Sequence, residues 1–460
     1  MTYRNWRILT SVVFICMVCA IQAHRTRGLG DIGFAIDMIE QNYVEPVNRR
    51  ELYKAAMTGI GNALDPFSSY IPSEQFGAFQ MQLSQQFGGL GIVIEPPSES
   101  GRLKIVNTVY GSPAARAGIL SGDQIDTING QSVIGMTVQN ASDKLRGKPG
   151  TSVDLTVLRA DVTEPIAIRI ERAIIETESV TGDRRKEDGR WDFMMQADPN
   201  IAYIRVEIFG EKTPSELEQA LRSVRDRAKG LILDLRDNSG GLLPTATDLC
   251  DMFLDEGTIV STVGRFGVVE STRKANLGVE IPMNVPMVVL INHDSASASE
   301  VTAGCLQDLH RATIMGERSY GKGSVQNVVQ IEGGGAALRL TSAHYFPPSG
   351  RNIHRRKDAK ETDDWGVKPD EGFQIALDEE QTRKVFERLR RRSNPVSNSA
   401  AQLMNLDKST TESGPLLSNS PALDSSTLDF SALDFSALDF SLAEDPQLSA
   451  AVVFLQKKIR

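Results

Sequence analysis

The sequence predicts a multi-domain protein built around an α/β core. Its 460 residues correspond to about three domains of ordinary size, and its 40% hydrophobic content is enough for packed cores. Two near-continuous apolar runs, Gly230–Leu235 and Val285–Ile291, are typical of strands that an α/β sheet buries on both faces. Neighbouring segments, Pro214–Lys229 and Thr245–Leu254, are predicted helices. This alternation predicts an α/β region over residues 173–375.

The first 27 residues are predicted to be a membrane-targeting segment. Arg4 and Arg7 precede an apolar run from Ile8 to Ile21, and a basic flank before about 7–15 apolar residues is the pattern of a secretory signal. The run is shorter than the roughly 20 apolar residues of a spanning helix. Ala23 could end a cleavage site, but Ile21 is a poor small residue two places earlier. The segment is therefore either a signal peptide or a retained membrane anchor, and both predict export.

Two further regions are predicted between the leader and this core. Residues 28–83 are expected to be helical, because apolar residues recur there every three or four positions. Residues 84–172 change to short strands with alternating apolar residues, as in Val153–Val157. Asn129-Gly130 predicts a tight turn in that region, and a short helix is expected from Thr137 to Leu145.

The C-terminal part is predicted to be less ordered. Arg383–Arg392 is a charged, helix-like run, and residues 393–427 are rich in Ser, Asn, Thr and Pro, which is typical of a flexible linker. The pentapeptide Leu428–Ala432 then recurs twice, which favours a low-complexity expansion over an interaction tail. We therefore expect residues 376–444 to be a charged and low-complexity linker, and the C-terminal tail to be disordered. Residues 445–460 are expected to end the chain as a capped amphipathic helix.

Composition argues against several classes of function. The formal net charge of −9 disfavours nucleic acid as the main partner, because phosphate binding relies on a basic surface. Four cysteines are too few for a disulfide framework. Two of them lie in the leader, and Cys250 and Cys305 are too few and too far apart in sequence for a zinc cluster. No metal or other cofactor is therefore expected.

Segments rich in serine or glycine carry the candidate chemistry of the α/β region. The first, Asn292–Glu300, follows a buried strand and precedes a helical stretch. Its serines would stand at a helix N-terminus, where the helix dipole favours developing negative charge. Such serines serve either as nucleophiles or as helix caps, and caps are the commoner use.

The second segment, Gly316–Gln326, holds a lone lysine, Lys322, among glycines and small residues. A lysine acts as a general base only when neutral, and burial without a nearby carboxylate lowers its pKa toward that state. A surface turn and a phosphate-binding loop are the alternatives, but Gly323 stands where a strict phosphate loop needs Ser or Thr. In the third segment, Leu233–Leu243, a strand ends in Gly240-Gly241, whose amides could line an oxyanion hole or simply form a tight connection.

Together the three segments resemble the carboxyl-terminal processing (tail-specific) protease family, whose members are PDZ-containing Ser-Lys peptidases. The family marks are Leu-Arg-x-Asn-x-Gly-Gly, Thr-Ala-Ser-Ala-Ser-Glu and Gly-Lys-Gly-x-x-Gln, and they occur here in that order. This sequence departs from the family at four positions: Asp237, Ser239, Asp294 and Ser295. Further similarity is carried by Ala63–Tyr70, Gly111–Gly118, Gly122–Gly130, Tyr345–Arg351 and Gly366–Asp370. The resemblance covers about residues 30–372 and extends to the last helix. It implies a helical N-terminal region, a β-sandwich-like PDZ domain and an α/β protease core of the ClpP/crotonase-like type.

The resemblance also implies the catalytic residues. Ser297 takes the place of the nucleophile, Lys322 that of the general base, and Gln326 that of the residue which positions the lysine. The backbone amides of Gly241 and Ala298 would form the oxyanion hole. None of the departures removes a catalytic group, since the oxyanion role needs only backbone N–H groups.

Residues 84–172 are implied to be the PDZ domain, which would bind a substrate's C-terminal tail as an added strand. Peptide contacts are expected from a glycine-rich loop, the strand after it and one basic side chain: Gly89, Leu90, Gly91, Ile92, Ile94 and Arg146. The double glycine could instead be a strand-entry turn, and Arg146 a surface residue.

The implied function is that of a serine endopeptidase which cleaves exported or membrane-associated proteins at or near their C-termini. Its partners would be protein or peptide tails, and its location the bacterial cell envelope, periplasmic or extracytoplasmic, with membrane anchoring if the leader is retained. The alternative is a non-catalytic PDZ-containing binding or scaffold protein with an inactive protease fold. A Ser-His-Asp enzyme and a metalloprotease are disfavoured, because the sequence lacks Gly-x-Ser-x-Gly and His-Glu-x-x-His motifs.

Overall fold

The structure, a computed structural model, describes residues 12, 17, 30–83, 85–95, 101–160, 162–393 and 440–460. These residues form two compact units. One contains the described residues up to Phe76 together with Gln326–Thr341, and the other contains Gly77–Val325 and Ser342–Arg460. The predicted leader, apart from two residues, the predicted flexible linker beyond Ser393 and the pentapeptide repeats before Phe440 lie outside the described residues. No helix within the described ranges is long and apolar enough to cross a bilayer.

The first unit joins N-terminal helices to part of a β-hairpin. Residues 30–42 are helical, and α2 (Arg49–Asn62) follows, with Asn48 as its N-cap. β1 (Ser69–Ile71) pairs antiparallel with the first half of β20 (Ala336–Phe346), which forms the hairpin with β19 (Ser324–Ile331). The prediction of a helical region is confirmed except at β1, which is too short to show a strand period. α3 (Ser73–Leu83) then leads into the second unit.

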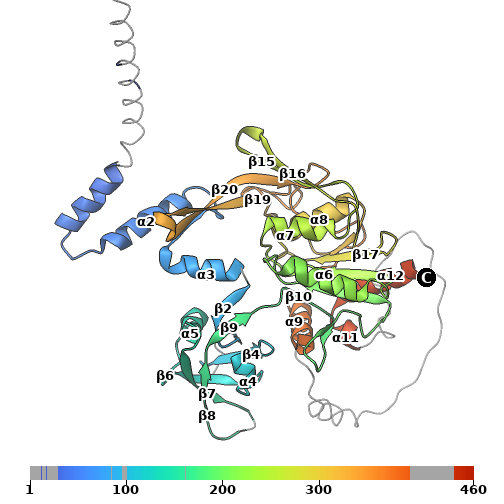
Figure 1. The fold of residues 1–460 in the computed structure, drawn as a ribbon, viewed down its shortest axis with the longest axis horizontal. Helices are drawn as coiled ribbons and strands as arrows, with labels where there is room; N and C mark the ends of the chain where they lie inside the picture. Colours follow the sequence, from blue (N-terminus) through green and yellow to red (C-terminus); the bar gives the residue numbers. More distant parts are fainter. Residues whose placement is uncertain are drawn as a thin grey trace, which may run out of the picture. The chain divides into compact units, whose positions relative to one another are not determined.

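Residues 86–176 form a β-rich region (Figure 1). Its main strands are β3 (Ile92–Glu95), β4 (Leu103–Thr108), β5 (Gln124–Ile128), β6 (Gln131–Ser132), β7 (Ser152–Leu158) and β8 (Ile166–Glu171). They make an antiparallel sheet in the order β3-β4-β5-β7-β8, with β6 beside β5. Two short helices, α4 (Pro113–Arg116) and α5 (Val138–Leu145), complete the region. The predicted Asn129-Gly130 turn and the predicted short helix are confirmed.

The two ends of the β-rich region lie side by side. β2 (Gln86–Gly89) enters it and β9 (Ala173–Glu176) leaves it, and these two strands pair antiparallel. The region is therefore inserted through one two-stranded stem. Its own core is apolar and includes Leu103, Ile105, Val153 and Leu155.

The α/β core is a five-stranded sheet. Its strands are β10 (Val180–Thr181), β13 (Ile201–Val206), β14 (Gly230–Asp234), β17 (Met287–Ile291) and β18 (Thr313–Gly316), in that order. The last four are parallel, and β14 and β17 are fully buried, as the apolar runs predicted. Because β14 and β17 are parallel neighbours, the loops that follow their carboxyl ends lie at the same edge of the sheet.

Helices cover both faces of this sheet. α6 (Thr213–Val224), α7 (Leu243–Asp251) and α8 (Ala298–Asp308) pack on one face, and α12 (Pro446–Ile459) packs on the other (Figure 1). The predicted capped terminal helix is confirmed, since Asp445 accepts the Leu448 amide at 3.0 Å. The charged run before the linker is α9 (Glu379–Ser393), and α11 (Phe440–Ala443) precedes α12.

The remaining strands flank the core. β15 (Thr258–Gly264) pairs with β16 (Val269–Lys274) and with the second half of β20, while β11 (Arg184–Arg185) pairs with β12 (Trp191–Asp192). The packing of α7 on α8 brings the Cys250 and Cys305 thiols into hydrogen-bond contact. The long separation of the two cysteines in the sequence therefore does not reflect their distance in the fold. Two thiols alone are still too few ligands for a zinc cluster.

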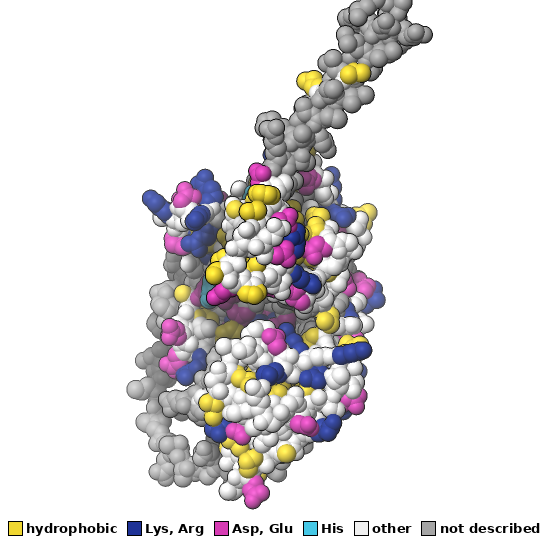
Figure 2. Space-filling model, turned by 90° about the vertical axis from the view of Figure 1, so that its left-hand side faces the viewer, with side chains coloured by type: hydrophobic (Ala, Val, Ile, Leu, Met, Phe, Trp, Pro, Cys, Tyr) yellow, Lys and Arg dark blue, Asp and Glu magenta, His cyan; other side chains and the backbone are white. Residues whose placement is uncertain are grey.

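Charged side chains of both signs are interspersed on the face seen in Figure 2. The described residues on that face form no continuous basic surface of the kind that binds phosphate backbones. This distribution agrees with the acidic net charge of the sequence.

Candidate active site

Ser297 stands where the loop after β17 meets α8. Its backbone has φ 56° and ψ −113°, a conformation that non-glycine residues rarely adopt and that the surroundings must maintain. The next residue, Ala298, begins α8, so Ser297 occupies the N-cap position. A serine here presents its side chain at the positive end of the helix dipole.

The three serines of this loop have different environments. The Ser295 hydroxyl accepts the Asn292 amide at 2.9 Å and donates to the Leu235 carbonyl at 2.8 Å. The Ser299 hydroxyl donates to the Asn238 carbonyl at 2.8 Å. Ser295 and Ser299 are completely buried, whereas Ser297 is partly exposed. Of the three, only Ser297 is open to a substrate.

The predicted glycine turn lies against Ser297. A Cβ atom on Gly240 would come within 2.8 Å of the Ala296 carbonyl oxygen and of Ser297 Cβ, and the φ of Gly240 is 102°. A Cβ atom on Gly241 would lie 2.2 Å from the Phe209 carbonyl oxygen. Only glycine therefore allows the chain to approach the serine loop this closely.

Two backbone amides remain available beside Ser297. Within the described residues, neither the Gly241 amide nor the Ala298 amide donates a hydrogen bond. Ala298 is the first residue of α8, whose early N–H groups have no partner inside the helix. The position where a Gly240 Cβ would stand is 3.0 Å from the Ala298 nitrogen, so turn and helix start are adjacent. Such amides can stabilise an oxyanion.

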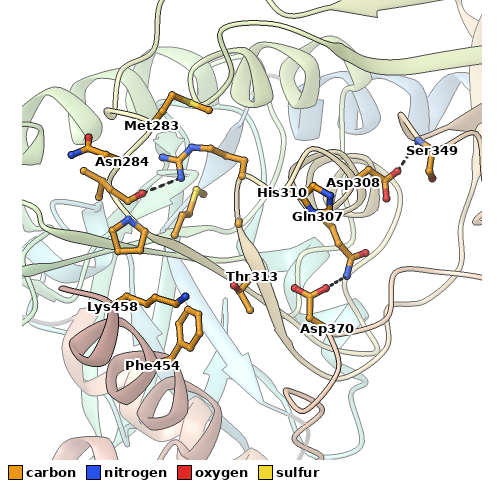
Figure 3. Close-up of a pocket in the computed structure, with 15 residues that line it drawn as sticks. Met283, Asn284, Gln307, Asp308, His310, Thr313, Ser349, Asp370, Phe454 and Lys458 are labelled. Carbon is orange, nitrogen blue, oxygen red and sulfur yellow. Dashed lines mark hydrogen bonds between the residues drawn. The ribbon is translucent and has the colours of Figure 1, made fainter. Parts of the chain in front are cut away.

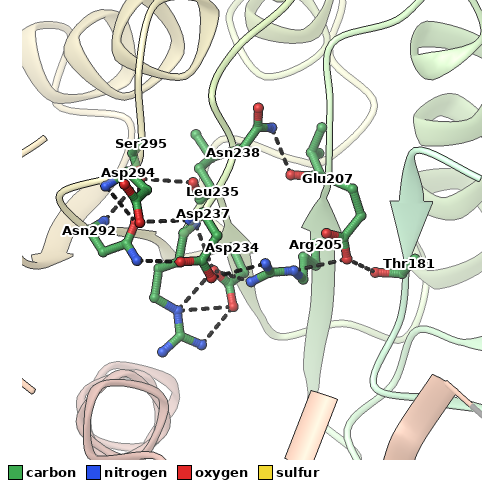
Figure 4. Close-up of polar contacts among 12 residues, drawn as sticks. Thr181, Arg205, Glu207, Asp234, Leu235, Asp237, Asn238, Asn292, Asp294 and Ser295 are labelled. Carbon is green, nitrogen blue, oxygen red and sulfur yellow. Dashed lines mark hydrogen bonds and ion pairs between the residues drawn. The ribbon is translucent and has the colours of Figure 1, made fainter. Parts of the chain in front are cut away.

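A pair of reciprocal hydrogen bonds fixes the glycine turn to the serine loop (Figure 4). The Asp237 amide donates to Asn292 Oδ1 at 2.9 Å, and Asn292 Nδ2 donates to Asp237 Oδ1 at 2.7 Å. The Ala296 amide adds a bond to the Asn238 carbonyl at 3.0 Å. Asp237 has φ 61°, a conformation that Asp and Asn tolerate better than most residues.

A single buried carboxylate, Glu300, joins the serine loop to the lysine loop. Its oxygens accept the Ser297 amide at 2.8 Å and the Lys322 amide at 2.7 Å. They also accept the Gly321 amide at 2.7 Å and the Ser319 hydroxyl at 2.6 Å. Burial raises the pKa of this carboxyl, and the hydrogen bonds oppose that shift. Sequence reasoning missed Glu300, although Ser297-Ala-Ser-Glu300 has the spacing of a capping box.

The lysine loop is held by its backbone. Besides the Lys322 amide, the Lys322 carbonyl is bound, because it accepts the Tyr345 hydroxyl. A Cβ atom on Gly321 would lie 2.6 Å from Arg355 Cβ, and one on Gly323 would lie 2.6 Å from the His354 nitrogen. The two glycines thus let the loop pass close to His354 and Arg355.

The environment of Lys322 differs from the expected one in two respects. Lys322 is partly rather than completely buried, and a carboxylate, that of Glu300, accepts its backbone amide, whereas burial without a nearby carboxylate was expected. The two glycines that flank Lys322 are buried. Gln326 lies on β19 in the other unit, where its Nε2 donates to Thr341 Oγ1 at 3.3 Å.

The predicted peptide loop of the β-rich region joins β2 to β3. The carbonyls of Leu90 and Gly91 accept the amides of Ala114 and Val109, at 3.0 and 2.8 Å. In the described part of the chain, the amides of Leu90 and Gly91 themselves donate no hydrogen bond. Gly91 has φ 76° and lies against Ser112, so a side chain would not fit there.

The other predicted peptide contacts lie around this loop. Gly89 ends β2, and Ile92 and Ile94 are partly buried on β3, an edge strand of the sheet. The Arg146 side chain is exposed, and its guanidinium lies 5.8 Å from the centre of the Phe87 ring. Five of the six predicted residues therefore lie in the loop and the edge strand, and the sixth, Arg146, has its backbone beside Gly89 and its guanidinium over Phe87.

A separate cavity lies at the opposite edge of the core sheet (Figure 3). It is lined by residues before β17 and after α8, including Met283, Asn284, His310 and Thr313. Ser297 follows the carboxyl end of β17, so this cavity at the amino ends is remote from the site just described. Among the described residues, no group of three or more His, Cys, Asp or Glu side chains could hold a metal ion.

Known proteins match the chain over both the α/β core and the β-rich region. The profile of peptidase family S41 matches residues 200–372, and that of the PDZ domain matches residues 105–159. The carboxy-terminal-processing protease of Bartonella bacilliformis is 39% identical over 330 residues, which cover 71% of this chain and 72% of the relative. The carboxy-terminal processing protease CtpA of Bacillus subtilis is 33% identical over 375 residues, 79% of this chain and 75% of the relative.

A solved structure also aligns with the chain. The photosystem II D1 C-terminal processing protease is 27% identical, with a TM-score of 0.43, over 75% of this chain and 86% of its own. The extent and identity of the matches to curated relatives are decisive for the family. The chain, with its PDZ domain, belongs to the carboxy-terminal processing proteases of peptidase family S41 and is a serine peptidase.

Proposed function

We propose that this chain is a Ser-Lys endopeptidase that trims the C-terminal tails of exported or membrane-associated proteins. The observation that carries the assignment is the difference among the loop serines, because Ser297 is partly exposed while Ser295 and Ser299 are buried and hydrogen-bonded to backbone carbonyls. Lys322 is the proposed base, on a loop that shares the Glu300 carboxylate with Ser297. Gln326 is the proposed positioning group for Lys322.

The proposed reaction follows the acyl-enzyme route. Neutral Lys322 accepts the proton of the Ser297 hydroxyl as Oγ attacks the peptide carbonyl. The amides of Gly241 and Ala298 stabilise the oxyanion of the tetrahedral intermediate. Protonated Lys322 then gives its proton to the leaving amine, and water releases the acyl group by the reverse sequence of proton transfers.

Tail recognition is assigned to the PDZ domain. β3 is an edge strand, so an extended peptide can pair with it, and the available amides of Leu90 and Gly91 can bind a terminal carboxylate. Ile92 and Ile94 supply apolar contact, which favours apolar tails. The leader sequence supports export to the bacterial cell envelope, either by a cleaved signal peptide or by a retained membrane anchor.

Peptide cleavage tests the catalytic assignment. A library of peptides with different C-termini is incubated with the wild type and with Ser297→Ala, Lys322→Ala and Ser299→Ala. We expect loss of cleavage in the first two variants and retention in Ser299→Ala, a matched serine of the same loop. Equal cleavage by Ser297→Ala and the wild type would refute the nucleophile, and an inactive wild type that still binds tails would favour the binding-protein alternative.

Removal of the PDZ domain tests tail recognition. Because β2 and β9 are paired, residues 90–172 can be replaced by a short Gly-rich turn between Gly89 and Ala173. The variant is expected to cleave unstructured peptides without preference for their C-termini. An unchanged cleavage rate and unchanged tail preference would refute the proposed role of the domain.

A further inference from the structure

Tyr345 holds the lysine loop at two points. It lies on β20 with 2% of its surface exposed. Its amide donates to the Gly323 carbonyl at 3.2 Å, and its hydroxyl donates to the Lys322 carbonyl. The carbonyls of the proposed base and of the residue after it are therefore both bound by one residue of β20.

The same hydroxyl meets the proposed nucleophile. The Tyr345 phenol is in hydrogen-bond contact with the Ser297 side chain. A phenol has one proton to donate, and here that proton goes to the Lys322 carbonyl. The phenol oxygen is then left to accept the Ser297 hydroxyl, a contact that holds Ser297 Oγ in place until the hydroxyl turns to Lys322 and gives up its proton. Burial and the nearby Glu300 carboxylate raise the pKa of Tyr345 well above its usual value, so the phenol stays protonated.

We infer that Tyr345 is a positioning residue for the Ser297–Lys322 reaction: one hydroxyl orients the nucleophile and fixes the backbone that carries the base. The inference rests on the proposed function. A buried tyrosine needs only one partner to satisfy its hydroxyl, and the Lys322 carbonyl alone would do so. The contact with Ser297 is therefore additional to what folding requires.

Tyr345→Phe in the full chain tests this role, because it removes only the hydroxyl. Tyr320→Phe is the matched control, since Tyr320 lies in the same loop, is 50% exposed, and its hydroxyl makes no hydrogen bond within the described residues. Peptide cleavage is measured per active site, counted with a serine-reactive fluorophosphonate. We expect kcat to fall at least about tenfold in Tyr345→Phe with KM changed less than about twofold, because misplacing reacting groups acts on the chemical step. Tyr320→Phe should match the wild type.

Counting active sites separates positioning from folding. If Tyr345→Phe contains fewer active sites but each turns over at the wild-type rate, the residue is only structural and the inference is overturned. An unchanged kcat overturns it as well. Ser297→Ala and Lys322→Ala are measured alongside: if either cleaves normally, the proposed function fails, whereas two inactive variants with a normal Tyr345→Phe refute only the role of Tyr345.

Discussion

Arg236 and Asp445 form a buried two-point ion pair although they are 209 positions apart in the sequence. Arg236 Nη1 and Nη2 each lie 2.9 Å from an Asp445 oxygen. Arg236 belongs to the turn that leads to Gly240 and Gly241, and Asp445 caps α12. The terminal helix is thereby bonded directly to the turn that carries half of the proposed oxyanion hole.

Asp445→Ala is expected to destabilise the fold strongly. It leaves the buried Arg236 without one partner and removes the α12 cap, and breaking a buried pair costs about 3–5 kcal/mol. Unfolding in urea measures this change. Glu444→Ala is the matched control, because Glu444 is partly exposed and pairs with Arg391 on the surface, where a pair contributes at most about 1 kcal/mol. Equal losses in the two variants would contradict the argument.

Much of this site follows from local sequence, because glycines, a strand end and a helix start are properties of short segments. The buried runs predicted β14 and β17, and parallel pairing of those strands brings their loops together. The partners of these loops depend on long-range packing instead. Tyr345 lies in a strand of mixed exposure, and nothing in its neighbourhood marks it as a contact of Ser297.

Polar residues inside buried elements were the hardest to interpret from sequence. β13 is fully buried, but it contains Tyr203 and Arg205. Because of these two polar residues its sequence is not a continuous apolar run and did not predict a buried strand. Tyr203 donates to Asp234 at 2.7 Å, and Arg205 lies between Glu207, Asp234 and Asp237 (Figure 4). Burial of such polar residues is tolerated because they are paired, and one shared partner, Asp234, comes from the neighbouring strand β14.

Glu300→Gln is expected to reduce kcat by about 10²-fold, because it loosens both loops at once. The carboxylate accepts hydrogen bonds through both oxygens, but the glutamine amide has only one acceptor oxygen. Its NH₂ group would therefore face backbone N–H donors, such as the amides of Ser297 and Lys322, with which it cannot form a hydrogen bond. An unsatisfied buried donor also costs about 1–3 kcal/mol of stability. Kinetics per titrated active site and unfolding in urea measure the two effects.

Glu317→Gln controls for the loss of a carboxylate near the loops. Glu317 is partly buried and accepts the Leu377 amide at 2.8 Å, with no bond to the amides of Ser297 or Lys322. We expect kcat close to that of the wild type. If Glu317→Gln and Glu300→Gln were equally slow, the specific bridge between the two loops would not explain the defect.

Gly240→Ala is expected to displace Ser297. The added Cβ would come within 2.8 Å of Ser297 Cβ and of the Ala296 carbonyl oxygen, so the serine loop must move. A small displacement of a nucleophile can lower kcat on the order of 10²-fold. Gly278→Ala is the matched control: Gly278 has φ 109°, close to the 102° of Gly240, but no atom lies within 4 Å of the position that its added methyl group would take.

The two glycine variants separate backbone strain from steric displacement. Both force a non-glycine residue to a positive φ, which costs roughly 1–2 kcal/mol of stability. Only Gly240→Ala should also lose turnover per active site. Normal turnover in Gly240→Ala would show that the turn does not need to approach the nucleophile this closely.

His293→Gln is expected to change stability in a pH-dependent way. Burial alone would lower the pKa of His293, but the hydrogen bond to Glu317 and the charges of Asp294 and Glu317 outweigh it and raise the pKa above 6.5. A raised pKa in the folded state means that protonated His293 stabilises the fold below pH 6.5, and that this contribution is lost as the pH rises through the folded-state pKa. Since the side chain is 67% exposed, the contribution should stay below about 1 kcal/mol. Urea unfolding of the wild type and of His293→Gln from about pH 5 to about pH 9 measures this contribution. The difference in unfolding free energy between the two proteins should shrink with rising pH and be smaller in a Glu317→Gln background. A difference that does not depend on pH would contradict the ion pair.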